Sequence, residues 1–378
     1  MKICSKCIYD EKISGISFND KGICNYCDQI DFLAKQYGTG AEKGQRLLEK
    51  LIKSIKNSGK GKKYDCVIGV SGGTDSSFLL LKAVNWGLRP LAVHYDNTWN
   101  TSIASQNIFH ITKAANVDLY SHVVNNVEID DIKRSFLLSG VPEFDADTDI
   151  AFVQVLRSTA AKFGIKYILE GHSFTTEGIS PVGSSIYYDG KYIADIHSKY
   201  GTHPIKTFPN LTLTRFLKWT ILYGQNFVRP LWYINYNKEN ARNYLEKNTD
   251  WKYYGGHHLE NRASTFAHTI WHPRRYKTDF RILTLAASAR NGSLKHETAL
   301  KLYSEEVSED PSLIEFVMKR TNLNREEFDK VMNGPRRTWS DFKNYRQTFQ
   351  YLRPLFYLLS RFGRVPMSFY LKYCFPPK

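Results

Sequence analysis

Hydrophobic runs flank the polar stretch SGGTDSS, which occupies residues 71–77. Gly72 and Gly73 allow the main chain to approach an anion closely, and the hydroxyl groups of Ser71 and Ser76 add hydrogen-bond donors. A glycine-rich loop between a strand and a helix commonly holds phosphate, because backbone N–H groups and the positive end of the helix dipole point at the ligand. The stretch therefore predicts a phosphate loop.

A carboxylate within the same loop narrows the choice of possible ligands. Asp75 would repel phosphate unless a metal lies between them, which indicates Mg²⁺ bridging to pyrophosphate oxygens. No Gly-Lys-Ser/Thr follows the glycines, and G-x-G-x-x-G is absent, so neither a Walker A loop nor a dinucleotide fingerprint fits. The simpler alternative is a helix cap, which needs one such residue and not five. We predict catalytic roles for Asp75, Ser71 and Ser76. The predicted cofactor contacts in this loop are Ser71, Gly72, Gly73, Thr74, Asp75, Ser76 and Ser77.

Four of the six cysteines form two C-x-x-C pairs near the start of the chain. The pairs are Cys4 with Cys7 and Cys24 with Cys27. In a reducing compartment this spacing is typical of a tetrahedral Zn²⁺ site, while a coincidental or redox pair is the alternative. Four thiolates fill the coordination shell, so we expect a structural metal. Cys66 lies within an apolar run and is expected to pack in the core.

Strand and helix patterns alternate after residue 60. This order predicts a doubly wound α/β domain with a parallel sheet over residues 61–235. It follows a zinc module at 1–32 and a connecting helix and linker at 33–60, and it precedes a helical, basic and aromatic region at 236–378. The expected strands are 64–70, 88–97, 118–124 and 165–173, and the expected helices are 76–86, 102–117 and 147–164.

Polar clusters end three of the expected strands. They are SGGTDSS, HYDNTWN from His94 and EGHSFTTEG from Glu170. Because ligands bind at the carboxyl ends of the strands in such sheets, we expect these clusters to lie side by side. From about Pro204 the chain is expected to be helical.

The composition is that of an ordinary soluble protein, with a net charge of +15. That charge is compatible with a polyanionic partner but does not choose among nucleic acid, a phosphorylated substrate and a membrane. No secretory signal and no apolar stretch of about twenty residues is evident, so a cytoplasmic location is expected. The basic, aromatic tail from Ser340 fits either a docking surface for a partner or anionic membrane, or a helical cap with a solvated face. We favour the cap.

The S-G-G-x-D-S loop resembles that of the PP-loop ATP pyrophosphatase superfamily. The resemblance implies that the loop binds the pyrophosphate of ATP while a substrate is adenylated. It also implies that Val93, His94 and Asp96 hold the adenosine, and that Gly171 and His172 form a second nucleotide-contacting turn.

Further stretches resemble the N-acetyl sugar amidotransferases of the WbpG/PseA type, as far as about residue 300. They include CSKCIYD, LRPLAVHYDNTWN, KYILEGHSFTTEGI, YIADIHSKYG, IKTFPNL, YNKENAR and DWKYYGGHHLEN. The family's basic run is only partly kept, at Lys277, Asp279 and Arg281.

This resemblance implies an ATP-dependent, AMP-forming amidotransferase that replaces the oxygen of a nucleotide-linked N-acetyl sugar with ammonia. The product would be an acetamidino sugar for lipopolysaccharide O-antigen or for flagellin glycans such as those with pseudaminic acid. Ammonia would come from a separate glutaminase subunit, and nucleic acid is not an expected partner. Candidate substrate contacts are Glu177, Asp195, His197, Lys199, Arg262, Lys277 and Arg281, with His257 and His258 as weaker ones. The histidines could equally be structural.

Two other functions compete. A PP-loop tRNA-modifying enzyme of the thiolation or lysidine type would explain the zinc module and the charge, and it predicts a basic face adjoining the loop. A thiolase would also need a cysteine near the ATP, and neither Cys66 nor Cys374 is placed for that. A non-catalytic zinc scaffold would not need the intact loop.

Overall fold

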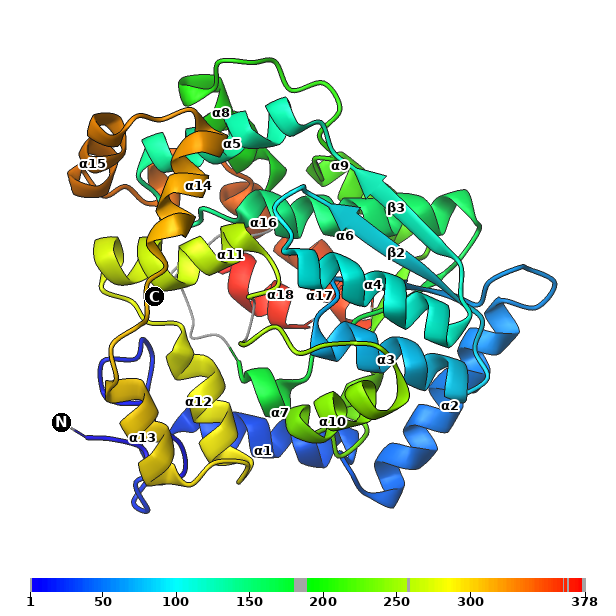
Figure 1. Cartoon of the computed structure of the whole chain (residues 1–378). Coiled ribbons are helices and arrows are strands. Elements are labelled where there is room, and N and C mark those ends of the chain that lie inside the picture. Colours follow the sequence, from blue (N-terminus) through cyan, green and yellow to red (C-terminus); the bar gives the residue numbers. More distant parts are fainter. Residues whose placement is uncertain (1, 180–188, 257–258, 363, 366, 376–378) are drawn as a thin grey trace.

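A computed structural model describes residues 2–179, 189–256, 259–362, 364–365 and 367–375 (Figure 1). Its centre is a five-stranded sheet in the order β3-β2-β1-β4-β5, in which every neighbouring pair is parallel. The predicted doubly wound parallel sheet is confirmed. The strands are β1 (Cys66–Gly69), β2 (Pro90–Asp96), β3 (Leu119–Val123), β4 (Tyr167–Leu169) and β5 (Asn226–Val228).

Alternate residues of β1 face opposite sides of the sheet. Cys66 and Ile68 pack with side chains of α3 (Thr74–Asn85) and α4 (Ser102–Ala115). Val67 packs with side chains of α5 (Asn126–Ser139) and α6 (Ala146–Lys162) on the other face. Because successive side chains of a strand point to opposite faces, helices cover both sides and every residue of this short strand is needed in the core. The prediction that Cys66 packs in the core is confirmed, since it is fully buried.

The segment after Pro204 differs from the expected all-helical region. It contains β5, three residues long between Gly224 and Pro230, which pairs with β4 at the sheet edge. A strand of this length is too short to show the alternation of apolar and polar residues from which strands are predicted. The expected helix at 76–86 begins two residues earlier, at Thr74. α5 belongs to a segment for which we expected neither helix nor strand.

Helices from both ends of the chain surround the sheet. The helices before the sheet are α1 (Asn25–Tyr37) and α2 (Glu42–Ser58). Among the described residues, no helix is both long and apolar enough to cross a membrane. Between β4 and β5 lie α7 (Phe174–Glu177), α8 (Gly190–Tyr200), α9 (Leu213–Leu217) and the π-helical η1 (Lys218–Leu222). Beyond β5 lie η2 (Pro230–Trp232), α10 (Lys238–Asn248), α11 (Arg262–Phe266), η3 (Ala267–Tyr276), α12 (Arg281–Arg290), α13 (His296–Ser304), α14 (Pro311–Thr321), α15 (Arg325–Asn333), η4 (Trp339–Asp341), α16 (Arg346–Tyr351), α17 (Arg353–Arg361) and α18 (Met367–Tyr373).

The cysteine module at the start of the chain packs on helices from the far end of the sequence. Tyr9 and Tyr26 share a buried apolar cluster with Ile282 and Ala286 of α12 and Ala299 of α13. Figure 1 shows the blue N-terminal segment lying against these two yellow and orange helices. The module therefore depends on the C-terminal half for part of its core.

A buried lysine joins α5 to the start of α6. Lys133 is fully buried, and its Nζ atom lies 2.5 Å from Oδ1 of Asp145 and 2.7 Å from Oδ1 of Asp147. Ser264 of α11 also donates to Asp145. Removing one partner of such a group leaves uncompensated charge in the interior, which costs far more than losing an exposed ion pair.

We predict that Lys133→Met, which keeps the volume but removes the charge, lowers the free energy of unfolding by about 3–5 kcal/mol. The matched control is Lys330→Met, because Lys330 pairs with Glu326 on the surface with 73% of its side chain exposed. That variant should lose less than about 1 kcal/mol. Chemical denaturation measures both, and equal losses would contradict the prediction.

Candidate active site

The loop after β1 and the turn after β4 meet where the strand order reverses. β1 pairs with β2 on one side and with β4 on the other, so the carboxyl ends of these strands are neighbours. A Cβ atom added to Gly171 would lie 2.9 Å from the carbonyl carbon of Asp75 and 3.0 Å from the nitrogen of Ser76. The expectation that these polar strand ends lie side by side is confirmed, at the position where doubly wound sheets bind ligands.

The loop 71–77 has little room for side chains at its glycines. Gly72 has a φ of +79°, and a Cβ atom there would lie 2.3 Å from the carbonyl oxygen of Ala104. Its own carbonyl accepts hydrogen bonds from Nε1 of Trp251 at 2.9 Å and from Nδ2 of Asn107 at 3.2 Å. The loop is thus fixed by backbone geometry and by the segment that follows α10.

The hydroxyl groups of the loop fall into two kinds, those in contact with each other and those without a protein partner. Oγ of Ser71 is 3.3 Å from Oγ of Ser76 and accepts a hydrogen bond from the nitrogen of Gly73 at 3.2 Å. The buried hydroxyl oxygens of Thr74 and Ser77 make no hydrogen bond within the protein. The loop leads directly into the first turn of α3, whose N–H groups have no partners inside the helix. Donors at this end of the helix suit a phosphate group.

Asp75 accepts from two groups of the segment after β5. The hydroxyl of Tyr236 donates to its Oδ1, and Nζ of Lys238 lies 2.9 Å from its Oδ2. Desolvation opposes the charged form of Lys238, but Asp75 and Glu177 outweigh it and raise the lysine's pKa. Because both carboxylate oxygens already accept from protein donors, Asp75 offers a metal ion only its remaining lone pairs. The site therefore combines the carboxylate of Asp75, the half-buried cation of Lys238 and the hydrogen-bond donors of the loop.

The turn after β4 adds aromatic and charged groups. Nε2 of His172 lies 3.6 Å from Glu177, and Nδ1 of His172 accepts from the indole of Trp232 at 3.3 Å. Arg229 pairs with Glu170 at 2.8 Å and stacks over Trp232. Desolvation of the His172 ring and the nearby Arg229 guanidinium lower the pKa of His172 to about 4. Of the predicted substrate residues, Glu177 therefore lies beside the loop.

The residues expected to hold the adenosine lie at the end of β2. Val93 is fully buried, and Nδ1 of His94 lies 3.1 Å from the carbonyl oxygen of Val70. Burial lowers the pKa of His94, so the ring is neutral near pH 7. The carboxylate of Asp96 accepts from the nitrogen of Thr98 at 2.8 Å. They border the loop through Val70, and their role in binding stays a prediction.

Three predicted substrate residues on α8 have partners away from the loop. Nε2 of His197 lies 2.8 Å from Asp131 of α5, and the carboxylate of Asp195 binds Nζ of Lys199 at 2.8 Å. Lys199 also lies over the ring of Phe342. These contacts hold α8 to α5 and to the C-terminal region, which agrees with the structural interpretation of the histidine.

The remaining substrate candidates are also spread apart. Arg262 lies over the ring of Phe316, and Lys277 has a φ of +56° at the end of η3. Arg281 pairs with Asp279 at 2.7 Å and donates to carbonyl oxygens at the end of α13, among them that of Glu305. His257 and His258 lie outside the described residues. The structure does not gather these side chains around the loop.

Four cysteine sulfurs form a separate cluster. Those of Cys4, Cys7, Cys24 and Cys27 all lie within 4.8 Å of one another and are buried, so they could hold a metal ion. Nε of Arg290 donates to Cys27 at 3.2 Å. Nε2 of His296 lies 2.9 Å from the carbonyl oxygen of Cys4. Helices α12 and α13 therefore support the cluster directly.

Sequence reasoning left four residues of this site unassigned. Tyr236 and Lys238 contact Asp75, Tyr254 accepts from the nitrogen of Thr74 at 3.2 Å, and Glu260 lies beside Gly73. All four belong to the stretches YNKENAR and DWKYYGGHHLEN, in which we had named only His257 and His258, as weaker substrate candidates. A signal was available, because polar residues there are mixed with tyrosines in a region otherwise expected to be helical.

We predict that the His172 ring titrates near pH 4, compared with the ordinary value of 6.5. As the pH falls, the His172 ring takes up a proton in the unfolded chain near pH 6.5, but in the folded chain only near pH 4. The contribution of His172 to the free energy of unfolding therefore decreases as the pH drops from 6.5 towards 4. Replacement of Arg229 by Met should raise the pKa, since it removes a repulsive cation. NMR titration of the ring measures both, and an ordinary pKa in the native chain would contradict the prediction.

Comparisons with known proteins give distant relatives. An uncharacterized protein of Methanocaldococcus jannaschii, MJ1599, is 29% identical over 171 residues, which cover 45% of this chain. The chain spans 58% of the length of that relative.

Two solved structures superimpose on this chain with low TM-scores. NMN synthetase from Francisella tularensis has a TM-score of 0.33 and 12% identity, and covers 75% of this chain and 95% of its own. The NH3-dependent NAD synthetase from Campylobacter jejuni has a TM-score of 0.30 and 13% identity, and covers 78% and 98%.

A family model matches a segment of the C-terminal half. Its description is LPS biosynthesis protein WbpG-like, C-terminal domain, and it covers residues 260–355. The match extends past residue 300, where the resemblance that we identified in the sequence stopped. It includes α12 and α13, which support the cysteine cluster. The predicted resemblance to the WbpG type is confirmed over residues 260–355, which match this family model.

Proposed function

We propose that the protein is an ATP-dependent amidotransferase that acts on the N-acetyl group of a nucleotide-linked sugar. The main support is the loop 71–77 at the switch point of the sheet, in a chain that carries a WbpG-like C-terminal domain. The acetamidino product would serve a lipopolysaccharide or a related surface glycan.

An amide carbon is a poor electrophile, so its oxygen must first become a leaving group. In the proposed reaction the acetamido oxygen attacks the α-phosphorus of ATP, and pyrophosphate leaves with the electrons of the broken P–O bond. Ammonia then attacks the imidate carbon of the adenylated sugar. AMP departs with the oxygen, and loss of a proton leaves the amidine.

The residues of the chain supply donors and charge for the first step. Ser71, Ser76 and the backbone at Gly72 and Gly73 would hold the pyrophosphate, with help from Thr74 and Ser77, whose buried hydroxyls have no protein partner. The half-buried cation of Lys238 pairs with the loop carboxylate, and it can neutralise charge that develops on the phosphates. Asp75 would contribute to holding the Mg²⁺ that accompanies ATP, which supplies further neutralisation when it is bound. Val93, His94, Asp96, Gly171 and His172 are the proposed nucleotide contacts.

Ammonia needs a source outside the described site. All six cysteines are buried, four of them in the cluster, so none is placed as an exposed glutaminase nucleophile. We therefore propose a separate glutaminase subunit as a partner.

The alternative function is tRNA modification, which the net charge of +15 would suit.

The deciding experiment incubates the chain with ATP, Mg²⁺, an ammonium salt and a panel of nucleotide-linked N-acetyl sugars. We expect AMP and a sugar product about one mass unit lighter, as replacement of O by NH requires. Ammonium salt replaces the glutaminase, so the test does not depend on that partner. AMP release with tRNA but with none of the sugars would contradict the proposal.

The same assay tests the loop carboxylate. Asp75→Asn should reduce AMP formation about 100-fold or more, because the loop loses the charge that a metal ion and Lys238 require. Asp329→Asn is the matched control, since Asp329 is an exposed aspartate of α15. Circular dichroism should show the same fold for both variants, and full activity in Asp75→Asn would remove the proposed role.

We also propose that the cysteine cluster holds one structural Zn²⁺. Tetrahedral zinc with sulfur ligands at about 2.3 Å requires sulfur–sulfur distances of about 3.8 Å. The distances from Cys4 to Cys27, from Cys7 to Cys24 and from Cys24 to Cys27 are 3.8, 3.7 and 3.6 Å. The donor Arg290 would offset part of the negative charge of four thiolates.

We predict one zinc per chain by elemental analysis. Cys27→Ser should lose most of this zinc, because it removes the ligand that Arg290 supports. Cys374→Ser is the matched control, since Cys374 is buried outside the cluster and should leave the metal content unchanged. Equal zinc in the two variants would contradict the assignment.

A further inference from the structure

The outward face of α17 exposes large apolar side chains between two arginines, Arg353 and Arg361. Leu358 is 54% exposed and Phe362, just past the helix, is 76% exposed, with Tyr357 exposed beside them. The inward face is apolar, because Phe356 and Leu359 are buried in the main core. The outer face of a surface helix is normally polar, so exposed leucine and phenylalanine side chains there are a feature of contact surfaces. The outer face of α17 therefore requires an explanation.

A second exposed apolar segment lies at the end of this helix. Leu222 is 77% exposed and Ile221 is 51% exposed at the end of η1, next to the exposed Tyr223. Arg364 connects the two segments, because its Nη1 atom donates to the carbonyl oxygen of Gly224 at 2.6 Å. We call the side chains of Ile221, Leu222, Tyr223, Arg353, Tyr357, Leu358, Arg361, Phe362 and Arg364 the α17 surface.

The two chain segments that form this surface carry only positive charge. Residues 342–378 contain seven lysines and arginines and no aspartate or glutamate. Residues 203–228 contain three lysines and arginines and again no acidic residue. Arg353 and Arg361 flank the apolar side chains of α17. A partner for this surface must accept both apolar side chains and cations, and it must itself be anionic.

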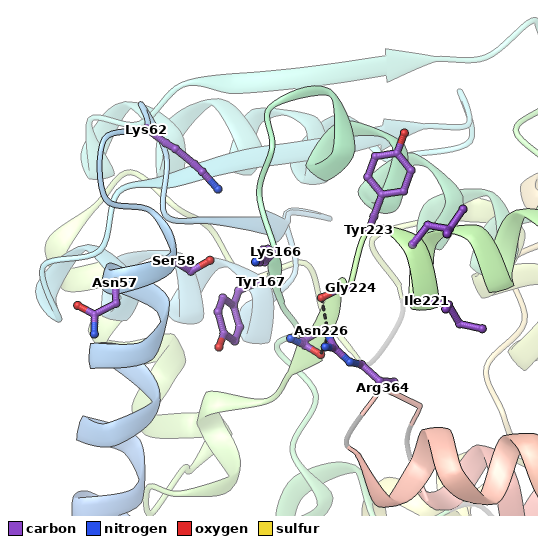
Figure 2. Close-up of a pocket in the computed structure, with 11 residues that line it drawn as sticks. Asn57, Ser58, Lys62, Lys166, Tyr167, Ile221, Tyr223, Gly224, Asn226 and Arg364 are labelled. Atoms are coloured by element: carbon purple, nitrogen blue, oxygen red, sulfur yellow. Dashed lines mark hydrogen bonds between the residues drawn. The ribbon is translucent and has the colours of Figure 1, made fainter.

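A pocket beside the surface adds further cations. It has a volume of about 780 Å³, and Lys62, Lys166 and Arg364 line it together with Ile221 and Leu222 (Figure 2). Figure 2 shows Arg364 reaching Gly224 at one end of the pocket and Lys62 at the other. The exposed apolar side chains thus lie next to a basic recess large enough for an anionic head group.

We propose that the α17 surface docks the protein on a bilayer that contains anionic lipids. Exposed Leu, Phe and Tyr side chains flanked by arginine are the features that insert at the boundary between head groups and acyl chains. Each basic residue near an anionic membrane strengthens binding about five-fold, while the apolar side chains anchor the contact. This reverses the interpretation of the tail that we favoured from the sequence.

The docking surface and the candidate active site lie at opposite ends of the parallel strands. Lys166 and Asn226 of the pocket lie at the amino ends of β4 and β5, whereas the loop 71–77 follows the carboxyl end of β1. All strands are parallel, so these ends point in opposite directions. Changes to the docking surface should consequently leave reactions at the loop unaffected.

The test is sedimentation with vesicles of phosphatidylcholine alone and of phosphatidylcholine with about one third phosphatidylglycerol. We expect the full chain to bind the anionic vesicles at least about ten-fold more tightly than the neutral ones, and more weakly in 0.5 M salt. The double variant Leu222→Ser/Phe362→Ser should lose about ten-fold in affinity, and Arg353→Gln/Arg361→Gln about 25-fold.

The matched control is Phe32→Ser/Phe109→Ser, which removes two other exposed phenylalanines, on α1 and α4. It should bind anionic vesicles as the native chain does. Equal binding of neutral and anionic vesicles, or equal loss in the control and in Leu222→Ser/Phe362→Ser, would overturn the proposal. Absence of any vesicle binding would also overturn it and would direct the search to an acidic protein surface.

Discussion

The close approach of two backbones at the reversal of the strand order determines the rest of the candidate site. The turn after β4 reaches the first turn of α3 so closely that Gly171 has no space for a side chain against Asp75 and Ser76. This contact follows from β1 pairing with both β2 and β4, since their following segments must then share one edge of the sheet. The loop is held on its other side by Trp251 and Asn107 at Gly72, so it is positioned before any ligand binds.

The C-terminal half completes the structure around this core in two places. Tyr236 and Lys238 bring a donor and a cation to Asp75, which stabilises this half-buried carboxylate. Within the WbpG-like segment, Arg320 of α14 pairs with Asp130 at 2.6 Å and donates to the carbonyl oxygen of Thr98 just past β2, so this segment is tied to the sheet edge. Arg290 of the same segment reaches Cys27, and the cysteine module therefore depends on residues that are distant in sequence.

The sequence was sufficient to predict the sheet, the loop and the cysteine cluster, because each depends on local residue types and spacing. Strand length explains why β5 escaped prediction, since Asn226–Val228 is too short to show a period. The partners of Asp75 could not be placed because Tyr236 and Lys238 reach it only through the fold of the chain after β5. The role of His197 was left open in the sequence between a substrate contact and a structural group, and its hydrogen bond with Asp131 favours the structural role.

The distribution of charge bears on the choice between the two proposed functions. Binding of tRNA at the loop would favour a broad basic face there, because affinity grows with the number of phosphates neutralised. Around the loop, Lys238 and Arg229 are instead balanced by Asp75, Glu170 and Glu177. The two segments without acidic residues, 203–228 and 342–378, meet where Arg364 contacts Gly224. This contact lies just before the amino end of β5, away from the loop. A mixed set of charges suits a small substrate with a few phosphates, so the excess positive charge of the chain is better explained by the α17 surface than by nucleic acid at the active site.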